Sequence, residues 1–267
     1  MISIAVAGAE GRMGSRIAVL SKDYEGLKLA AAFERSGHKD KGKDIGALLG
    51  IGETGVLLAD NPADVIDDAD VVISFTTVEA SLEHLRLAAK KGKAMVIGTT
   101  GFTKDAMKEV SRLTKKIPCV MASNMSTGVN LLLKVLQDVA EVLGDAYDVE
   151  IIEAHHRMKK DAPSGTALKM AQAVATALNR NIDKVAVYGR QGLIGERTAK
   201  EIGIQVIRAG DIVGEHTVIF GGLGERIEIT HKASSRDTFA RGALRAALWV
   251  NDKAAGLYDM QDVLGLK

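Results

Sequence analysis

Titratable side chains are dense between Glu150 and Ala167, in the run E-I-I-E-A-H-H-R-M-K-K-D-A-P-S-G-T-A. The run gathers two histidines, one arginine, two lysines and three carboxylates at the end of a strand-like segment, residues 149–154, and in the short loop after it. Folding alone does not explain so many polar groups at the end of one strand and in the loop after it. The run therefore predicts a site that binds a small anion and has acids and bases at hand.

The residue types in this run suit proton transfer. Histidine titrates near neutral pH, and the adjacent His155 and His156 face opposite ways in an extended chain, so that one can meet a substrate while the other orients or shields. Lys159 can bind a carboxylate, or protonate the carbanion-like centre that hydride addition leaves on a conjugated ring. Ser164-Gly165-Thr166 begins a helix, and the free N–H groups and dipole of a helix start can hold an anion.

Metal binding and a purely structural polar network are the competing interpretations of these residues. His155, His156 and His216 lack the helical i, i+4 pairing of many zinc sites, and no cysteine joins them, so we expect no metal. The structural network stays open as an alternative. Asp161 is expected to hold the loop or to pair with Lys160. The remaining histidines, His38, His84 and His231, are expected to be solvated or to lie on strand surfaces.

A glycine-rich turn of the dinucleotide-binding type, G-A-E-G-R-M-G, follows the first strand and opens the first helix. Gly8 allows the tight turn, Gly11 lets the backbone approach a pyrophosphate, and Gly14 lets helix and strand pack closely. The spacing G-x-x-G-x-x-G is a variant of the usual fingerprint, and a purely structural turn is the alternative.

An acidic and a basic residue stand where a cofactor's adenosine ribose is recognised. Glu34 follows the second strand, 20 residues after Gly14, where a carboxylate can bind both ribose hydroxyls of NAD. The guanidinium of Arg35 can hold the 2′-phosphate of NADP. The pair predicts use of both cofactors, with a surface salt bridge as the alternative. Two further loops leave strand ends on the ligand side of such a sheet and can border the nicotinamide: Gly98-Thr99-Thr100-Gly101 and Ala122-Ser123-Asn124-Met125.

The elements that must position these residues alternate in the first half of the chain. Continuous apolar strands separated by helices indicate a doubly wound, Rossmann-like parallel sheet covered on both faces. The expected strands are 2–7, 27–34, 71–75, 94–97 and 119–122, and the expected helices are 12–21, 78–91 and 104–116. The polar, glycine-rich segment from Gly37 to Gly55 is interpreted as a variable connection.

The second half has the texture of an α+β domain with an open mixed sheet. The expected helices are 127–143 and 164–178, and the expected strands are 149–154, 185–188, 204–209, 217–220 and 226–231. The strand faces carry more apolar residues than one short helical layer covers, which suggests burial against other subunits. The predicted domains are a dinucleotide-binding domain, residues 1–126, with the helical tail 236–267 packing back on it, and a substrate-binding and oligomerisation domain, residues 127–235.

Bulk properties exclude several classes of protein. The 267 residues are 46% hydrophobic and 26% charged, and 35 Lys and Arg against 34 Asp and Glu leave no global field that recruits nucleic acid or anionic lipid. The single cysteine, Cys119, lies in a buried-strand pattern, so neither a disulfide framework nor a cysteine metal cluster is expected. No basic leader and no run of about 18 apolar residues is present, and we expect a cytoplasmic protein that does not enter the membrane.

Over nearly the whole chain the sequence resembles the 4-hydroxy-tetrahydrodipicolinate reductase family, also called dihydrodipicolinate reductase. The run from Glu150 to Ala167 fits the family signature E-x-x-E-x-H-x-x-x-K-x-D-x-P-S-G-T-A at every position. The runs V-A-G-A-E-G-R-M-G, F-E-R, S-F-T-T, G-T-T-G-F and S-N-M-S-x-G-V-N appear in the family's order. The segment from Gly37 to Gly55 matches no pattern of the family.

The resemblance implies an NADPH- or NADH-dependent reduction of 4-hydroxy-tetrahydrodipicolinate to tetrahydrodipicolinate, with loss of water, in lysine and diaminopimelate biosynthesis. It also implies a homotetramer joined through the C-terminal sheets. His155 would be the proton donor and acceptor, Lys159 the proton donor, and His156, Gly165 and Thr166 would bind the cyclic dicarboxylate. The residues implied for the cofactor are Gly8, Ala9, Glu10, Gly11, Arg12, Met13, Glu34, Arg35, Gly98, Thr99, Thr100, Ala122, Ser123, Asn124 and Met125. The two domains would close to complete the site.

Two rival functions keep the same fold. A non-catalytic sensor of NAD(P) would not need the proton-donating set around His155 and Lys159. A reductase acting on a related amino acid or a semialdehyde is the other rival. A semialdehyde dehydrogenase needs a cysteine nucleophile, and Cys119, in its buried-strand pattern, does not fill that role.

Overall fold

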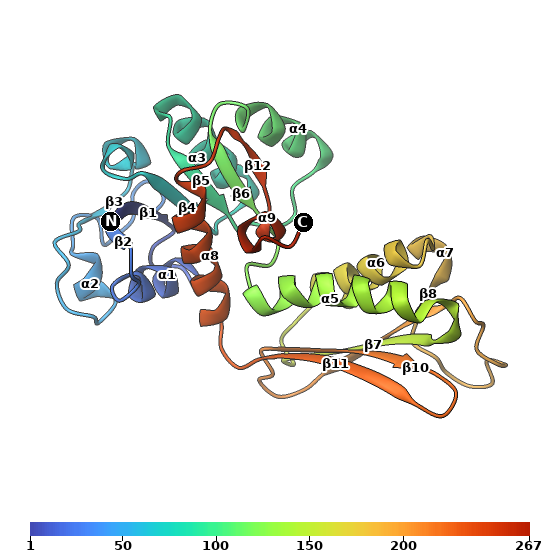
Figure 1. The fold of residues 1–267 in the computed structure, drawn as a ribbon. Coiled ribbons are helices and arrows are strands. Elements are labelled where there is room, and N and C mark those ends of the chain that lie inside the picture. Colours follow the sequence, from blue (N-terminus) through green and yellow to red (C-terminus); the bar gives the residue numbers. More distant parts are fainter. The chain divides into compact units, whose positions relative to one another are not determined.

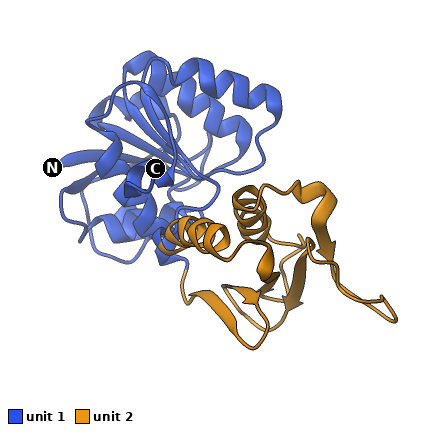
Figure 2. Cartoon of the chain, turned by 45° about the vertical axis from the view of Figure 1, so that its right-hand side comes forward, with its two compact units in different colours: residues 1–127, 236–267 blue, residues 128–235 orange.

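The computed structural model describes residues 1–267, which form two compact units. Unit 1 contains residues 1–127 and 236–267, and unit 2 contains residues 128–235 (Figure 2). Each unit has a sheet and a hydrophobic core of its own. None of the helices is both long and apolar enough to cross a membrane.

Unit 1 is built on a seven-stranded parallel sheet in the order β12-β6-β5-β4-β1-β2-β3 (Figure 1). Its strands are β1 (Ile2–Ala7), β2 (Leu27–Phe33), β3 (Leu58–Ala59), β4 (Val71–Ser74), β5 (Ala94–Ile97), β6 (Pro118–Met121) and β12 (Gly256–Tyr258). The chain runs outward from β1 in one direction through β2 and β3, and then returns to build β4, β5 and β6 on the other side of β1. The predicted Rossmann-like sheet is confirmed, and such a reversal of strand order marks where open α/β sheets bind ligands.

Helices cover both faces of this sheet, which is why its central strands are apolar throughout. Every residue of β4 and β5 is buried. Side chains of α1 and α8 belong to the core on one face, and those of α3 and α4 to the core on the other. The helices are α1 (Gly14–Ser21), α2 (Ile45–Leu48), α3 (Val78–Lys91), α4 (Lys104–Leu113), α8 (Asp237–Val250) and α9 (Met260–Leu264), and two 3-10 turns are η1 (Pro62–Asp64) and η2 (Ile66–Asp68).

The tail of the chain, which was expected to be helical and to pack back on this domain, also contributes a strand to unit 1. α8 packs against α1, β4, β5 and β6, and it lies so close to the end of β6 that a Cβ at Gly242 would be 1.7 Å from the Met125 carbonyl oxygen. The chain then adds β12 to the edge of the sheet, parallel to β6. It ends in α9, whose N-cap Asp259 forms a capping box with Asp262.

The segment from Gly37 to Gly55 is ordered by one carboxylate, and the interpretation as a variable connection missed this. Asp44 caps α2 by accepting from the Ala47 N–H at 3.0 Å. The same carboxylate accepts from the N–H groups of Thr54, at 3.1 Å, and Gly55, at 2.7 Å. These bonds close the loop on itself immediately before β3.

Unit 2 is a mixed five-stranded sheet in the order β11-β10-β7-β9-β8, with helices packed on one face. β7 and β8 pair with β9 in parallel, whereas β10 pairs antiparallel with both β7 and β11, so the open mixed sheet is confirmed. The strands are β7 (Asp148–His155), β8 (Ala186–Tyr188), β9 (Ile202–Arg208), β10 (Gly214–Gly221) and β11 (Arg226–Ala233). The helices are α5 (Thr127–Leu143), α6 (Gly165–Ala177) and α7 (Ile182–Val185), with a 3-10 turn η3 (Gly144–Ala146).

Candidate active site

The glycine turn of unit 1 is a tight backbone structure that only glycine can complete. Gly8 has a φ of +62°, a left-handed conformation that favours glycine, and its N–H donates to the Phe33 carbonyl oxygen at 2.8 Å. The Gly11 N–H folds back onto the Gly8 carbonyl oxygen at 2.9 Å. At Gly14, the first residue of α1, a Cβ would be 2.0 Å from that same oxygen. The turn therefore presents backbone without side-chain cover at a helix start, as a phosphate cradle requires.

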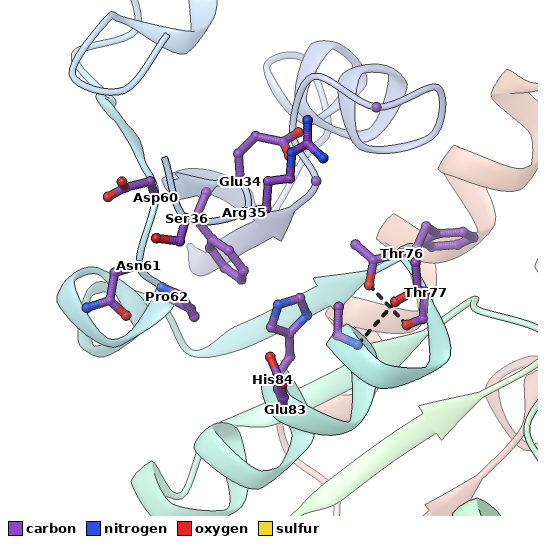
Figure 3. Close-up of a pocket in the computed structure, with 15 residues that line it drawn as sticks. Glu34, Arg35, Ser36, Asp60, Asn61, Pro62, Thr76, Thr77, Glu83 and His84 are labelled. Carbon is purple, nitrogen blue, oxygen red and sulfur yellow. Dashed lines mark hydrogen bonds between the residues drawn. The ribbon is translucent and has the colours of Figure 1, made fainter. Parts of the chain in front are cut away.

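A cavity of about 800 Å³ lies beside this turn, within the range of small-molecule sites (Figure 3). Glu34 and Arg35, directly after β2, both line it. One oxygen of Glu34, Oε1, accepts from the Glu10 N–H at 3.0 Å. This bond fixes the carboxylate against the glycine turn and leaves Oε2 for a ligand. The cavity is lined by Gly8, Gly11, Phe33, Glu34, Arg35, Ser36, Asp60, Asn61, Pro62, Phe75, Thr76, Thr77, Ala80, Glu83 and His84.

His84 lines this cavity from α3, and the expectation that it would be solvated or on a strand surface is wrong. Its side chain is buried, its Nδ1 lies 3.1 Å from Ser74 Oγ, and its ring stands edge-on to Phe33. Burial lowers the pKa of His84 to about 4, so the imidazole is neutral at physiological pH. The helical spacing of the sequence could have indicated this burial. The buried residues of α3 recur three or four positions apart, on one face of the helix: Ser81, His84, Leu85 and Ala88.

The loops after β5 and β6 leave the carboxyl ends of neighbouring strands, as predicted. A Cβ at Gly98 would lie 2.0 Å from the Phe75 ring, so glycine permits the position of that ring at the cavity wall. Thr99 is buried and its hydroxyl accepts from the Thr76 N–H at 3.0 Å, whereas Thr100 is exposed. In the second loop Ala122 and Met125 are buried, Ser123 is exposed, and Asn124 Oδ1 accepts from the Ser126 N–H at 2.9 Å.

Three groups with metal-ligand atoms also meet near the glycine turn. One ligand atom each of Glu10, His38 and Asp40 lies within 4.8 Å of the others, and His38 is half-buried. Asp40, however, accepts from Lys43 Nζ at 2.7 Å and lies 3.7 Å from Lys39 Nζ. Ammonium groups of the chain therefore already balance the charge of this carboxylate.

In unit 2 the acid–base cluster is centred on a carboxylate, Glu153, whose side chain is 0% exposed. His155 follows two residues later on β7, on the same side of the strand, and its Nδ1 lies 2.6 Å from Glu153 Oε2. Arg208, opposite His155 on β9, binds the same carboxylate with two parallel bonds of 2.8 and 2.9 Å. The Ser164 N–H donates to Glu153 Oε1 at 2.9 Å.

These contacts decide the charge states of the pair. Burial raises the pKa of Glu153, but the bonds from Arg208, His155 and Ser164 outweigh it, so that the pKa falls below its ordinary value. Burial lowers the pKa of His155, an effect that the Glu153 carboxylate only partly offsets. At neutral pH, Glu153 is therefore a carboxylate and His155 a neutral imidazole.

The other ring nitrogen of His155, Nε2, faces a position that carries no side chain. A Cβ at Gly214 would be 3.1 Å from this nitrogen. The His155 ring also stands edge-on to the ring of His216, with centroids 5.2 Å apart. Burial lowers the pKa of His216 to about 4, so this second imidazole is also neutral.

Lys159 lies in the loop after β7, with 21% of its side chain exposed. Its Nζ is 2.9 Å from Asp161 Oδ2, so the expected pairing of Asp161 with Lys160 is wrong. The Lys159 N–H closes a turn of the same loop by donating to the His156 carbonyl oxygen at 3.0 Å. His156 itself is half-buried. The hydrogen bond from Lys159 lowers the pKa of Asp161.

The predicted helix start is confirmed at α6. Ser164 is the N-cap, and its Oγ accepts from the Ala167 N–H at 3.1 Å. The same hydroxyl lies 3.0 Å from His216 Nε2, which ties the cap to β10. At Gly165, the first helical residue, an added Cβ would have no other atom within 4 Å. The first turn of α6 is therefore open on this side, while its cap is anchored.

The sequence pattern points to His155 and Lys159, but it indicates no role for Glu153 or Arg208. The spacing of two residues between Glu153 and His155 is a signal that could have paired them, because such residues share one side of a strand. No comparable signal exists for Arg208, which reaches the site only through the pairing of β9 with β7. Cys119 is fully buried, and burial raises the pKa of its thiol to about 12, so it is not a nucleophile.

A glycine turn on a Rossmann-like sheet, joined to a second domain that carries an acid–base cluster, defines an oxidoreductase that uses a pyridine dinucleotide. The family model "Dihydrodipicolinate reductase, N-terminus" matches residues 2–125, and "Dihydrodipicolinate reductase, C-terminus" matches residues 128–264. The chain belongs to the dihydrodipicolinate reductase family.

Individual relatives agree over the full length. The chain is 59% identical to the 4-hydroxy-tetrahydrodipicolinate reductase of Syntrophobacter fumaroxidans and 56% identical to that of Geobacter metallireducens, with all of each chain covered. Among solved structures, the dipicolinate-bound dihydrodipicolinate reductase of Paenisporosarcina sp. TG-14 is 26% identical, with a TM-score of 0.75 over 98% of each chain. An amine dehydrogenase of Mycobacterium smegmatis, 15% identical with a TM-score of 0.59 over 96% of this chain and 94% of its own, shares the fold alone.

Proposed function

We propose that this chain reduces 4-hydroxy-tetrahydrodipicolinate to tetrahydrodipicolinate, with NAD(P)H as reductant and loss of water, in lysine and diaminopimelate biosynthesis. The relatives that carry this activity in their names cover the whole chain. The observation that carries the proposal is the cluster of His155, Lys159 and the open start of α6 on one domain, in a chain whose other domain holds the glycine turn.

The cofactor residues are proposed from the sequence pattern and the family resemblance, with support from the geometry of the glycine turn. The glycine turn from Gly8 to Met13 would hold the dinucleotide phosphates. The N–H groups of Arg12 and Met13 would be the donors, because those of Gly8, Glu10 and Gly11 are bonded within the fold. Glu34 Oε2 would accept from the ribose hydroxyls, and Arg35 would take the 2′-phosphate of NADPH. The loops from Gly98 to Thr100 and from Ala122 to Met125 would border the nicotinamide ring. When bound, the cofactor supplies the hydride, and the protein supplies the proton.

The substrate carries two carboxylates on a nitrogen ring, and unit 2 offers matching groups. The open first turn of α6, with Gly165 and Thr166, would bind one carboxylate by N–H groups at the positive end of the helix dipole, and His156 would help to hold the substrate. Water would leave as the hydroxyl group together with a proton from the neighbouring ring carbon, which makes the ring conjugated. Hydride from NAD(P)H then adds to the ring, and Lys159 would donate the proton that completes the reduction. His155, neutral with Nε2 open, would accept and return protons at the same centre.

The direct test is steady-state turnover with NADH and with NADPH on the condensation product of pyruvate and aspartate semialdehyde. Oxidation of the cofactor that depends on this product supports the proposal. Calorimetry that detects dinucleotide binding, but neither turnover nor binding of a cyclic dicarboxylate, would instead support the non-catalytic sensor. Because the reaction draws on the reduced nucleotide pool, we also propose that the enzyme works in the cytoplasm.

Arg35 should decide how well NADPH is used. Replacing it by alanine removes the charge-assisted bond to the 2′-phosphate, so we expect KM for NADPH to rise about 10–100-fold, while KM for NADH stays within about threefold. Lys39→Ala is the matched control, because this lysine is a nearby exposed cation. An equal loss with both cofactors would show that Arg35 supports the loop and does not read the phosphate.

The family's tetramer is proposed to form through the sheet of unit 2. The face opposite the helices carries Ile152, Ala154 and Ile207, and Ile207 is 47% exposed. A second copy packed on this face would bury these side chains. We expect Ile207→Glu to lower the mass measured by analytical ultracentrifugation, whereas Val142→Glu, an exposed position on α5, should leave it unchanged. A tetramer that persists in Ile207→Glu would exclude this face.

A further inference from the structure

We propose that Glu153 is a positioning residue for the reductase reaction: it fixes the tautomer and direction of the His155 imidazole and, through the same carboxylate, anchors the start of α6. The proposal rests on the role proposed above for His155, and it assigns a purpose to a buried carboxylate that does not itself touch the substrate. Its support is geometric, because four donors from three different elements converge on two oxygen atoms.

The first consequence concerns the proton on His155. A carboxylate can only accept hydrogen bonds, and Glu153 Oε2 lies 2.6 Å from Nδ1, so the neutral imidazole must carry its one hydrogen on Nδ1. Nε2 is then a bare lone pair on the side where Gly214 leaves space. Without Glu153, the hydrogen would be free to occupy Nε2, where it would block proton acceptance.

The second consequence concerns the neighbouring loop and helix. The Ser164 N–H donates to Glu153 Oε1, so the N-cap of α6 is set by the carboxylate that orients His155. Arg208 donates to both carboxylate oxygens of Glu153 and also to the Asp161 carbonyl oxygen, at 2.6 Å. Asp161 in turn pairs with Lys159. The carboxylate of Glu153 thus contacts His155 and the start of α6 directly, and it is linked to Lys159 through Arg208 and Asp161.

The charged and titratable groups facing His155 come from every element around it. They are Glu153 on β7, Lys159 in the following loop, Arg208 on β9 and His216 on β10, with His231 on β11 paired to His216. Of these groups, only Glu153 raises the pKa of His155, whereas Lys159 and Arg208 lower it. Replacing Glu153 by the isosteric glutamine must therefore lower the pKa of His155. A merely structural change would leave it in place.

The experiment measures Glu153→Gln in the full-length enzyme against Glu150→Gln, a glutamate of the same strand that pairs with Arg190 and Arg197 instead. We expect kcat to fall about 10–100-fold in Glu153→Gln, with the limb of its pH profile that reports His155 moved to lower pH. Glu150→Gln should keep that limb. Glu153→Gln with wild-type kcat, or with reduced kcat and stability but an unmoved limb, would overturn the proposal.

A second measurement needs no variant and no substrate, and so separates this proposal from the proposed function. Nitrogen-15 NMR of the wild-type imidazoles at neutral pH should show His155 with its proton on Nδ1, strongly deshielded by the short bond to Glu153. A proton on Nε2 would overturn the proposal even if the reductase activity is confirmed. The expected tautomer together with no turnover of the dicarboxylate would leave the positioning intact and reject the proposed reaction.

Discussion

Replacing Lys159 by methionine is expected to lower kcat about 10²–10⁴-fold, the usual contribution of a positioned proton donor. Methionine keeps the apolar stem but removes the ammonium group, which lies 2.9 Å from Asp161 in the loop beside His155. The fold should tolerate the change, because Asp161 is 62% exposed and water can solvate it once its partner is lost. Steady-state kcat and KM, with thermal unfolding measured in parallel, test this expectation.

Lys160→Met is the matched control, because Lys160 is the adjacent residue and is exposed. We expect near wild-type turnover in this control and unchanged cofactor affinity in both variants. A rise in KM at constant kcat would make Lys159 a carboxylate-binding residue and not a proton donor. If Lys159→Met and His155→Ala both retain near wild-type rates, the chemistry belongs to other groups.

Local signals explain why several elements were predicted to the residue. α3 has the expected bounds because Thr77 caps its start, by accepting from Ala80 at 3.3 Å, and Gly92 ends it with a φ of +66°. β5 also has the expected bounds, because a strand that is buried on both faces must be apolar throughout. These features depend on neighbours in sequence.

The elements that were missed depend on partners far away in sequence. β12 has three residues and exists only because the open edge of β6 accepts it, which no local pattern reveals. His84 was assigned to the surface because its residue type is usually solvated, but the spacing of its neighbours on α3 buries it. Similarly, residue types and a family signature identified His155, while the sheet register brought Arg208 to Glu153.

The choice of partner for Asp161 shows the same limit within one loop. Lys160 is adjacent to Asp161 and Lys159 is two residues away, and composition cannot choose between them. In the structure the Lys159 N–H closes a turn on the His156 carbonyl oxygen, Lys159 pairs with Asp161, and Lys160 is exposed. The partner of Asp161 therefore depends on the conformation of the loop, which composition does not reveal.

Gly14→Ala should abolish cofactor binding through the backbone of the glycine turn. The added Cβ would lie 2.0 Å from the Gly8 carbonyl oxygen and 3.0 Å from Ala9 Cα, and backbone atoms of a closed turn cannot give way as a flexible side chain can. The turn or α1 must therefore shift, at a cost of about 1–3 kcal/mol in stability. We expect the Kd of NADH and of NADPH to rise at least about 100-fold, because the lost contacts are with the phosphates that both cofactors share.

Gly256→Ala provides the control for a glycine replaced in the same unit, because the nearest atoms to its Cβ would be Tyr258 ring atoms at 3.4 Å, an ordinary contact. Titration calorimetry with each cofactor should show near wild-type affinity in this variant. Equal effects on the two cofactors in Gly14→Ala, against a selective loss of NADPH in Arg35→Ala, would separate the phosphate cradle from the recognition of the ribose. Wild-type affinity in Gly14→Ala would instead mean that the close packing of α1 on the turn is structural and that the dinucleotide is held elsewhere.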